Sequence, residues 1–131
     1  MAYAPSQGFR REDQPGLYCV ELRTADWDRS VLWYREALGL TVLVRVIDDG
    51  YALLAAGETR LALLARTTPG EPSKRISLAF EVNDLPQIVS RLEQAGSSIS
   101  RVKTDAEGLR EVTTTDPDGN RIRLFCWPRG R

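Results

Sequence analysis

The residues best suited to chemistry are two carboxylates and one guanidinium group, which belong to Glu21, Glu81 and Arg123. A carboxylate can act as a general base, and an arginine fork can bind a carboxylate, a phosphate or a developing oxyanion. Histidine, the usual proton shuttle and the commonest metal ligand, is absent from the 131 residues. Because no histidine can activate Cys19 as a nucleophile, we interpret this cysteine as a small buried residue.

These three residues fall on predicted strands, where every second side chain points to the same face of a sheet. Apolar residues such as Val20, Leu78 and Leu124 occupy one face, which we predict to be the core. The opposite face is mostly polar, and we predict that it lines a cavity. The predicted ligand-binding residues on it are Cys19, Glu21, Arg23, Ser77, Glu81, Arg121, Arg123 and Phe125.

The strands belong to a strand–helix–three-strand pattern that occurs twice. Asp26 and Asp84, 58 residues apart, are each predicted to cap a helix, and Gly39 and Gly96 suit the left-handed position after its last turn. The expected strands are 17–24, 41–47, 51–55 and 60–65 in the first copy, and 76–82, 98–102, 109–115 and 122–127 in the second. The pattern predicts module one at 16–66, a linker at 67–75 and module two at 76–128.

Composition excludes several classes of function. Lysine plus arginine and aspartate plus glutamate both number 18, and this zero balance argues against a nucleic-acid-binding protein. No apolar run reaches the roughly 20 residues of a membrane span, and the first residues lack the apolar centre of a secretory signal. We therefore expect a cytoplasmic protein with a flexible tail over residues 1–15 and no disulfide between Cys19 and Cys126.

The chain resembles the vicinal-oxygen-chelate superfamily, which includes glyoxalase I, extradiol dioxygenases and bleomycin resistance proteins. The resemblance rests on "VELRTADWDRSVLWYREALGL", "LALLA", "LAFEVNDL" and "TTDPDGNRIRLF". It implies an α+β fold of two βαβββ modules, which form curved mixed sheets around a cavity within a single domain over 16–131. A homodimer is also expected, because a second copy would cover hydrophobic sheet edges and helix surface.

Four inward-facing side chains bind one divalent ion in the metal-dependent members of this superfamily. The resemblance places those positions at Cys19, Ala62, Ser77 and Arg123. Alanine offers no donor atom, neutral serine is a poor ligand, and the arginine charge would repel a cation. The sequence therefore predicts that the protein holds neither a metal nor another cofactor.

Three functions remain open. The first is a metal-independent binding protein that sequesters a small molecule such as an antibiotic or a metabolite. The second is a metal-free lyase or isomerase, in which Glu21 or Glu81 is the general base and Arg123 stabilises an oxyanion. The third is a degenerate protein with a structural or regulatory role. Glu21, Glu81 and Arg123 either recognise the ligand or form an internal salt-bridge network in place of the metal.

Aromatic and charged residues near these strands receive structural interpretations. Trp33 and Tyr34 are expected to pack in the core or in a dimer interface, and Trp127, at the end of the last strand, either to cover an edge of the sheet or to stack on a ligand. Arg110 and Glu111 are expected to face solvent.

Overall fold

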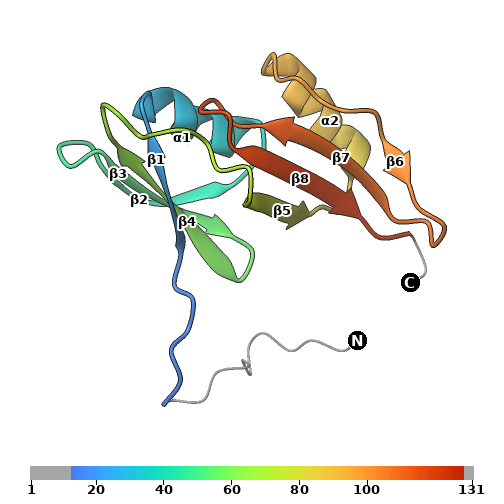
Figure 1. The fold of residues 1–131 in the computed structure, drawn as a ribbon, viewed down its shortest axis with the longest axis horizontal. Helices are drawn as coiled ribbons and strands as arrows, with labels where there is room; N and C mark the ends of the chain where they lie inside the picture. The colour runs from blue at the N-terminus through green and yellow to red at the C-terminus, as the bar shows by residue number, and fades with distance from the viewer. Residues whose placement is uncertain (1–12, 129–131) are drawn as a thin grey trace.

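A computed structural model describes residues 13–128, which fold as two four-stranded mixed sheets, each with one helix (Figure 1). The elements of module one are β1 (Val20–Thr24), α1 (Trp27–Glu36), β2 (Thr41–Val46), β3 (Tyr51–Ala56) and β4 (Thr59–Ala65). Those of module two are β5 (Ser77–Glu81), α2 (Leu85–Gln94), β6 (Lys103–Thr104), β7 (Arg110–Thr115) and β8 (Arg121–Cys126).

Both sheets have the same topology. Their strand orders are β1-β4-β3-β2 and β5-β8-β7-β6, and in each the first strand runs parallel to the last while the other neighbours are antiparallel. In Figure 1 the sheets lie next to each other, with α1 and α2 above them. The predicted α+β fold of two βαβββ modules is confirmed.

Two strand predictions were wrong in their bounds. The first strand begins at Val20, three residues later than expected, so that Cys19 precedes it. The strand expected over 98–102 is replaced by an isolated bridge between Ile99 and Thr114 and by the short β6. Ser100 explains the interruption, because its hydroxyl oxygen accepts the Thr113 amide at 2.9 Å and replaces a backbone acceptor in the ladder.

The repeated helix signals act as the sequence indicates. The side chain of Asp26 accepts a hydrogen bond from the Arg29 amide, and that of Asp84 accepts one from the Gln87 amide. Beyond the helices, Gly39 and Gly96 have φ angles of +76° and +75°, which side chains with a Cβ rarely adopt. The same two signals, an aspartate before the helix and a glycine after it, therefore set the beginning and end of both helices.

Alternate strand residues pack against the helices in one continuous core. Leu54 and Leu63 are buried beneath α1, and Ile122 and Leu124 are buried in module two. The other face of each sheet is turned away from the core, and we call it the open face. Val44 and Val46 lie on the open face of module one and remain 44% and 37% exposed.

Buried polar groups join the two modules. The hydroxyl of Tyr34 on α1 donates a 2.6 Å hydrogen bond to Asp116, in the turn between β7 and β8. The Ser30 hydroxyl donates to Asp118 in the same turn, and the Trp33 indole N–H donates to Ser97 after α2. Trp33 and Tyr34 are therefore buried at the interface between the modules.

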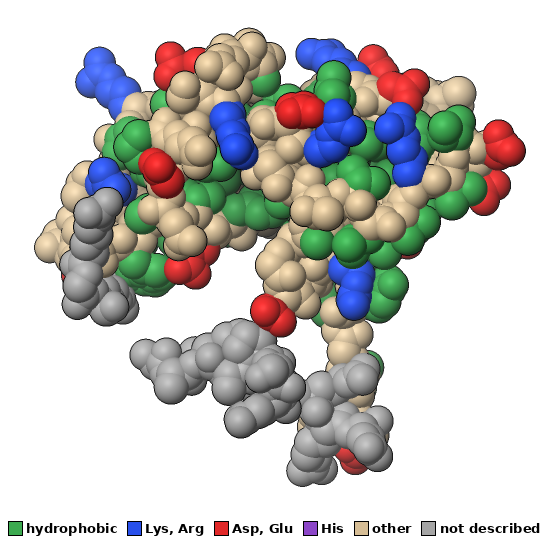
Figure 2. All heavy atoms as spheres, turned by 180° about the vertical axis from the view of Figure 1, so that it is seen from behind, with side chains coloured by type: hydrophobic (Ala, Val, Ile, Leu, Met, Phe, Trp, Pro, Cys, Tyr) green, Lys and Arg blue, Asp and Glu red, His purple; other side chains and the backbone are tan. Residues whose placement is uncertain are grey.

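Surface composition agrees with the balanced charge. On the face shown in Figure 2, basic side chains are interspersed with acidic and apolar ones, without a continuous basic stripe among the described residues. Within residues 13–128, neither α1 nor α2 has the length and apolar character needed to cross a membrane. Most of the predicted tail, residues 1–12, lies outside the described residues.

Candidate functional site

Strand register assigns the predicted site residues to two open faces. In module one, Glu21 pairs with Ala62, which pairs in turn with Leu53, so these three share the open face. Both Leu53 and Ala62 are buried without belonging to the core cluster. Tyr51 lies two residues from Leu53 and therefore also belongs to the open face of module one, a question that the sequence left open.

Cys19, Glu21 and Tyr51 form the polar part of this face. Partial loss of hydration raises the pKa of the Tyr51 phenol, and the nearby Cys19, Tyr18 and Glu21 raise it further. Glu21 and Arg23 are exposed, and Cys19 is half-buried. Within the single chain, Glu21 therefore lacks the dry surroundings in which a carboxylate works best as a general base.

Module two carries the more organised set of side chains, centred on Arg123 of β8. The Nε of Arg123 donates to Glu111 on the neighbouring β7, and the two side chains are 34% and 30% exposed. The guanidinium carbon also lies 4.9 Å from the ring centroid of Phe125, within cation–π range. Glu111 therefore holds the guanidinium at Nε, and Phe125 contacts its face. The two terminal nitrogens remain available to donate hydrogen bonds to other groups.

Of the two residues expected to face solvent, Arg110 is exposed, whereas Glu111 is half-buried and forms an ion pair with Arg123. Glu111 pairs with Phe125 in the β7–β8 ladder, diagonally opposite Arg123, and diagonal neighbours on one face lie within reach of long side chains. Counting back from the predicted "DPDGN" turn would have found this neighbour, because that turn fixes the register of the hairpin.

The predicted site residues do not all come together in one chain. Arg123 shares the open face of module two with Arg121, Phe125, Ser77 and Glu81, of which Phe125 is half-buried and the other three are exposed. The remaining predicted residues, Cys19, Glu21 and Arg23, belong to the other sheet. Of the two alternatives for Glu21, Glu81 and Arg123, the internal network is not seen in the single chain, because Arg123 pairs with Glu111 and neither other carboxylate has an ion pair within residues 13–128.

The positions that correspond to metal ligands do not fit a divalent ion. Ala62 is fully buried and has no donor, while Arg123 is a cation that already pairs with a carboxylate. The half-buried Cys19, which precedes β1, and the exposed Ser77 would be the remaining donors, too few to hold a divalent ion. Among the described residues, no group of three or more His, Cys, Asp or Glu side chains is arranged to hold a metal.

A cavity of about 560 Å³ opens at the end of β5 and β8, beside the predicted site. Glu81 and Asp84 bring negative charge to its lining, Arg110 brings positive charge, and Trp127 brings an aromatic ring. The Trp127 ring meets Phe125 edge to face, at 5.9 Å between centroids. Cys126 belongs to the core cluster and Arg110 pairs with it, so this cavity lies at the strand ends toward the start of α2. Of its lining, Glu81 shares the open face with Arg123, and Trp127 contacts Phe125.

A family model for the Glyoxalase/Bleomycin resistance protein/Dioxygenase superfamily matches residues 16–124. The chain belongs to this superfamily. A Bacillus subtilis (strain 168) relative, the uncharacterized protein YraH, is 28% identical over 123 residues, which cover 83% of this chain and 96% of that protein.

Solved structures of this superfamily share the fold. A putative glyoxalase family protein from Bacillus anthracis has a TM-score of 0.71 at 18% identity, over 91% of this chain and all of that one. A lactoylglutathione lyase from Agrobacterium tumefaciens has a TM-score of 0.66 at 16% identity, over 86% and 94% of the two chains. At these identities the likeness extends to the fold, and the function of this superfamily member depends on its own residues.

Proposed function

We propose that this superfamily member is a metal-independent binding protein for a small organic molecule, whose anionic or carbonyl end is bound by Arg123. The observation that carries the proposal is the position of the Arg123 guanidinium, which Glu111 and Phe125 hold at a former metal-ligand position. A guanidinium that is already oriented loses little freedom when it binds a carboxylate, a phosphate or a pair of carbonyl oxygens.

The surroundings of Arg123 supply the rest of a binding site. Phe125 and Trp127 offer aromatic surface for the body of a ligand, and Trp127 also lines the cavity of about 560 Å³ at the ends of β5 and β8, which Arg123 itself does not line. Because the acidic and basic residues balance, the site is better suited to a neutral or anionic metabolite or antibiotic than to a strongly cationic drug.

Binding is favoured over catalysis by the state of the carboxylates. A metal-free lyase or isomerase would use Glu21 or Glu81 as its general base, and such a base works best in a small, dry cleft. In the single chain both side chains are exposed and Glu21 belongs to the sheet that lacks Arg123, so Glu21 could act with Arg123 only across a dimer.

A second copy of the chain is the proposed cover for the open faces. Val44 and Val46 are exposed on the open face of module one, and the neighbouring Leu43 and Ile47 are 50% and 72% exposed. A two-fold partner would bury this apolar surface and would enclose the ligand site of module two.

A thermal-shift screen of small organic acids, phosphates and neutral metabolites tests the binding proposal. With a chelator present throughout, ligands should raise the melting temperature of the wild type and fail to do so for Arg123→Leu. Arg66→Leu removes an exposed arginine outside the site and should respond like the wild type. Hits that appear only when a divalent metal is added, or that persist in Arg123→Leu, would contradict the proposal.

A further inference from the structure

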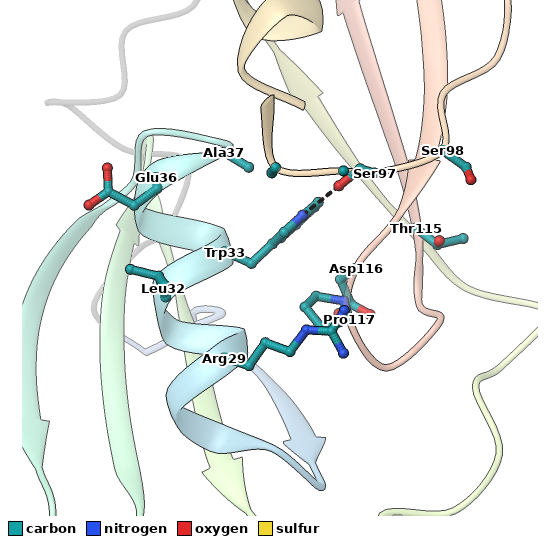
Figure 3. Close-up of a pocket in the computed structure, with 12 residues that line it drawn as sticks. Arg29, Leu32, Trp33, Glu36, Ala37, Ser97, Ser98, Thr115, Asp116 and Pro117 are labelled. Atoms are coloured by element: carbon teal, nitrogen blue, oxygen red, sulfur yellow. Dashed lines mark hydrogen bonds between the residues drawn. The ribbon is translucent and has the colours of Figure 1, made fainter. Parts of the chain in front are cut away.

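A second pocket, of about 490 Å³, lies on the helix side of the molecule where the two modules meet (Figure 3). Its walls come from α1, from the loop after α2 and from the turn between β7 and β8. None of the residues proposed to bind ligand on the open faces contributes to it. Any molecule bound here would contact both modules and would occupy a site separate from Arg123.

One stripe of α1 forms a wall of this pocket. Arg29, Trp33 and Ala37 follow one another at intervals of four residues, so they share one face of the helix. Trp33 reaches from α1 toward Ser97, to which its indole N–H donates a 2.8 Å hydrogen bond (Figure 3). Trp33 is 8% exposed, and its ring is fixed by the Ser97 hydrogen bond and by an edge-to-face contact with Tyr34. It therefore offers a fixed aromatic surface at the edge of the pocket.

Arg29 brings a positive charge whose hydrogen-bonding capacity is unused. Its side chain extends toward Pro117 in the β7–β8 turn (Figure 3), and within residues 13–128 its guanidinium has no hydrogen bond or ion pair. The nearest buried carboxylate of the lining, Asp116, already accepts bonds from the Tyr34 hydroxyl, the Asp118 amide and both nitrogens of Asn120. An incoming anion would therefore find the donors of Arg29 available.

The remaining lining favours an anion attached to an apolar body. Ser98 and Thr115 supply hydroxyl groups, and Leu32 and Pro117 supply apolar surface. Glu36, the other acidic residue of the lining, forms a 2.7 Å ion pair with the neighbouring Arg35 and points away from Trp33 in Figure 3. The charge of Glu36 is therefore largely compensated. The oxygens of Asp116 are occupied by hydrogen bonds, which leaves Arg29 as the one charged donor of the lining without a partner among the described residues.

We propose that this pocket binds a small aromatic carboxylate, with its ring against Trp33 and its carboxylate on Arg29. The pocket volume falls in the range of roughly 300–1,000 Å³ that holds small ligands. The guanidinium fork matches two carboxylate oxygens, and the hydroxyls of Ser98 and Thr115 add polar groups on the opposite wall of the pocket (Figure 3). Because the pocket joins α1 to the β7–β8 turn, its occupant also stabilises the contact between the modules.

Titration of the ¹⁵N-labelled protein, followed by NMR, tests this site. The probes are 4-phenylbutyrate, 4-phenylbutan-1-ol and 4-phenylbutylamine, which share one body and differ in charge. The carboxylate should shift the Trp33 indole N–H resonance, assigned with Trp33→Phe, and the backbone amides of Ser98 and Thr115. The alcohol and the amine should bind at least about tenfold more weakly.

Variants at position 29 separate the charge from the shape of the pocket. Arg29→Gln should weaken 4-phenylbutyrate about tenfold and leave the alcohol unchanged, whereas Arg29→Lys should retain part of the affinity. Arg66→Gln, an equal loss of charge outside the pocket, should have no effect. The proposal is overturned by shifts confined to Arg123 and Phe125, by no saturable binding, by equal affinity for acid and alcohol, or by full affinity in Arg29→Gln.

Discussion

Replacing Arg123 by leucine separates a ligand-binding role for this residue from a purely structural one. The variant removes the partner of Glu111 and keeps an apolar side chain beside Phe125. Breaking a fully buried ion pair costs on the order of 3–5 kcal/mol, whereas an exposed pair contributes about 0–1 kcal/mol. With side chains 34% and 30% exposed, this pair lies nearer the second limit. We therefore expect Arg123→Leu to lower the free energy of unfolding by about 1 kcal/mol.

Urea unfolding monitored by tryptophan fluorescence measures this loss, and Glu111→Gln completes a double-mutant cycle. The coupling energy between the two side chains should stay below about 1.5 kcal/mol, because water reaches Glu111 once the arginine is gone. Arg123→Leu should at the same time abolish the thermal shift produced by screened ligands. The reasoning is refuted if the variant loses 3 kcal/mol or more and yet binds those ligands with unchanged affinity.

Four further outcomes follow from the same structure. Tyr34→Phe should cost about 2 kcal/mol, because it removes a hydrogen bond to the buried Asp116 carboxylate, while Tyr18→Phe at an exposed site should cost almost nothing in urea unfolding. Burial, followed by the charge of Asp116, raises the pKa of the Tyr34 phenol above its usual value. Tyr34 therefore makes its full contribution to the free energy of unfolding below pH about 10, and this contribution is lost progressively as the pH rises further. The stability of the wild type should fall more steeply at alkaline pH than that of Tyr34→Phe. Elemental analysis should find no stoichiometric transition metal, and a chelator should leave the melting temperature unchanged. One tightly bound ion per chain would contradict the inference that Ala62 and Arg123 stand at metal-ligand positions and cannot bind a metal. Light scattering should give the mass of a dimer at micromolar concentration, and a monomer mass throughout would remove the proposed cover of the open faces.

Local signals in the sequence predicted the elements and their repeat, and the resemblance to the superfamily implied how the elements assemble. Helix caps at Asp26 and Asp84 and the glycines after each helix act within a few residues, so their effect is visible without tertiary structure. The strand predicted over 98–102 does not form, and the cause is also local. The Thr113 amide can donate either to a backbone carbonyl or to the Ser100 hydroxyl oxygen. The pattern of residue types does not show which of these two acceptors is used.

The site was predicted less completely, because its residues depend on pairing between strands. Alternation placed Arg123 and Phe125 on one face, but the partner of Arg123 is set by the register of β7 against β8. The "DPDGN" turn fixes this register, so Glu111 could have been predicted as the partner of Arg123. The separation of Glu21 from Arg123 could not, because it depends on how the two sheets are arranged in space. The pocket beside Trp33 exists only where both modules meet, and no motif in either module indicates it.

A crystal structure of the protein with its strongest ligand, grown in the presence of a chelator, tests the central claim most directly. The account predicts ligand density on the open face of module two, with an anionic or carbonyl oxygen within hydrogen-bonding distance of the terminal nitrogens of Arg123. Glu111 should remain on the opposite edge of the guanidinium, at Nε. A ligand that leaves Arg123 untouched, or that coordinates a metal ion at the site, would contradict it.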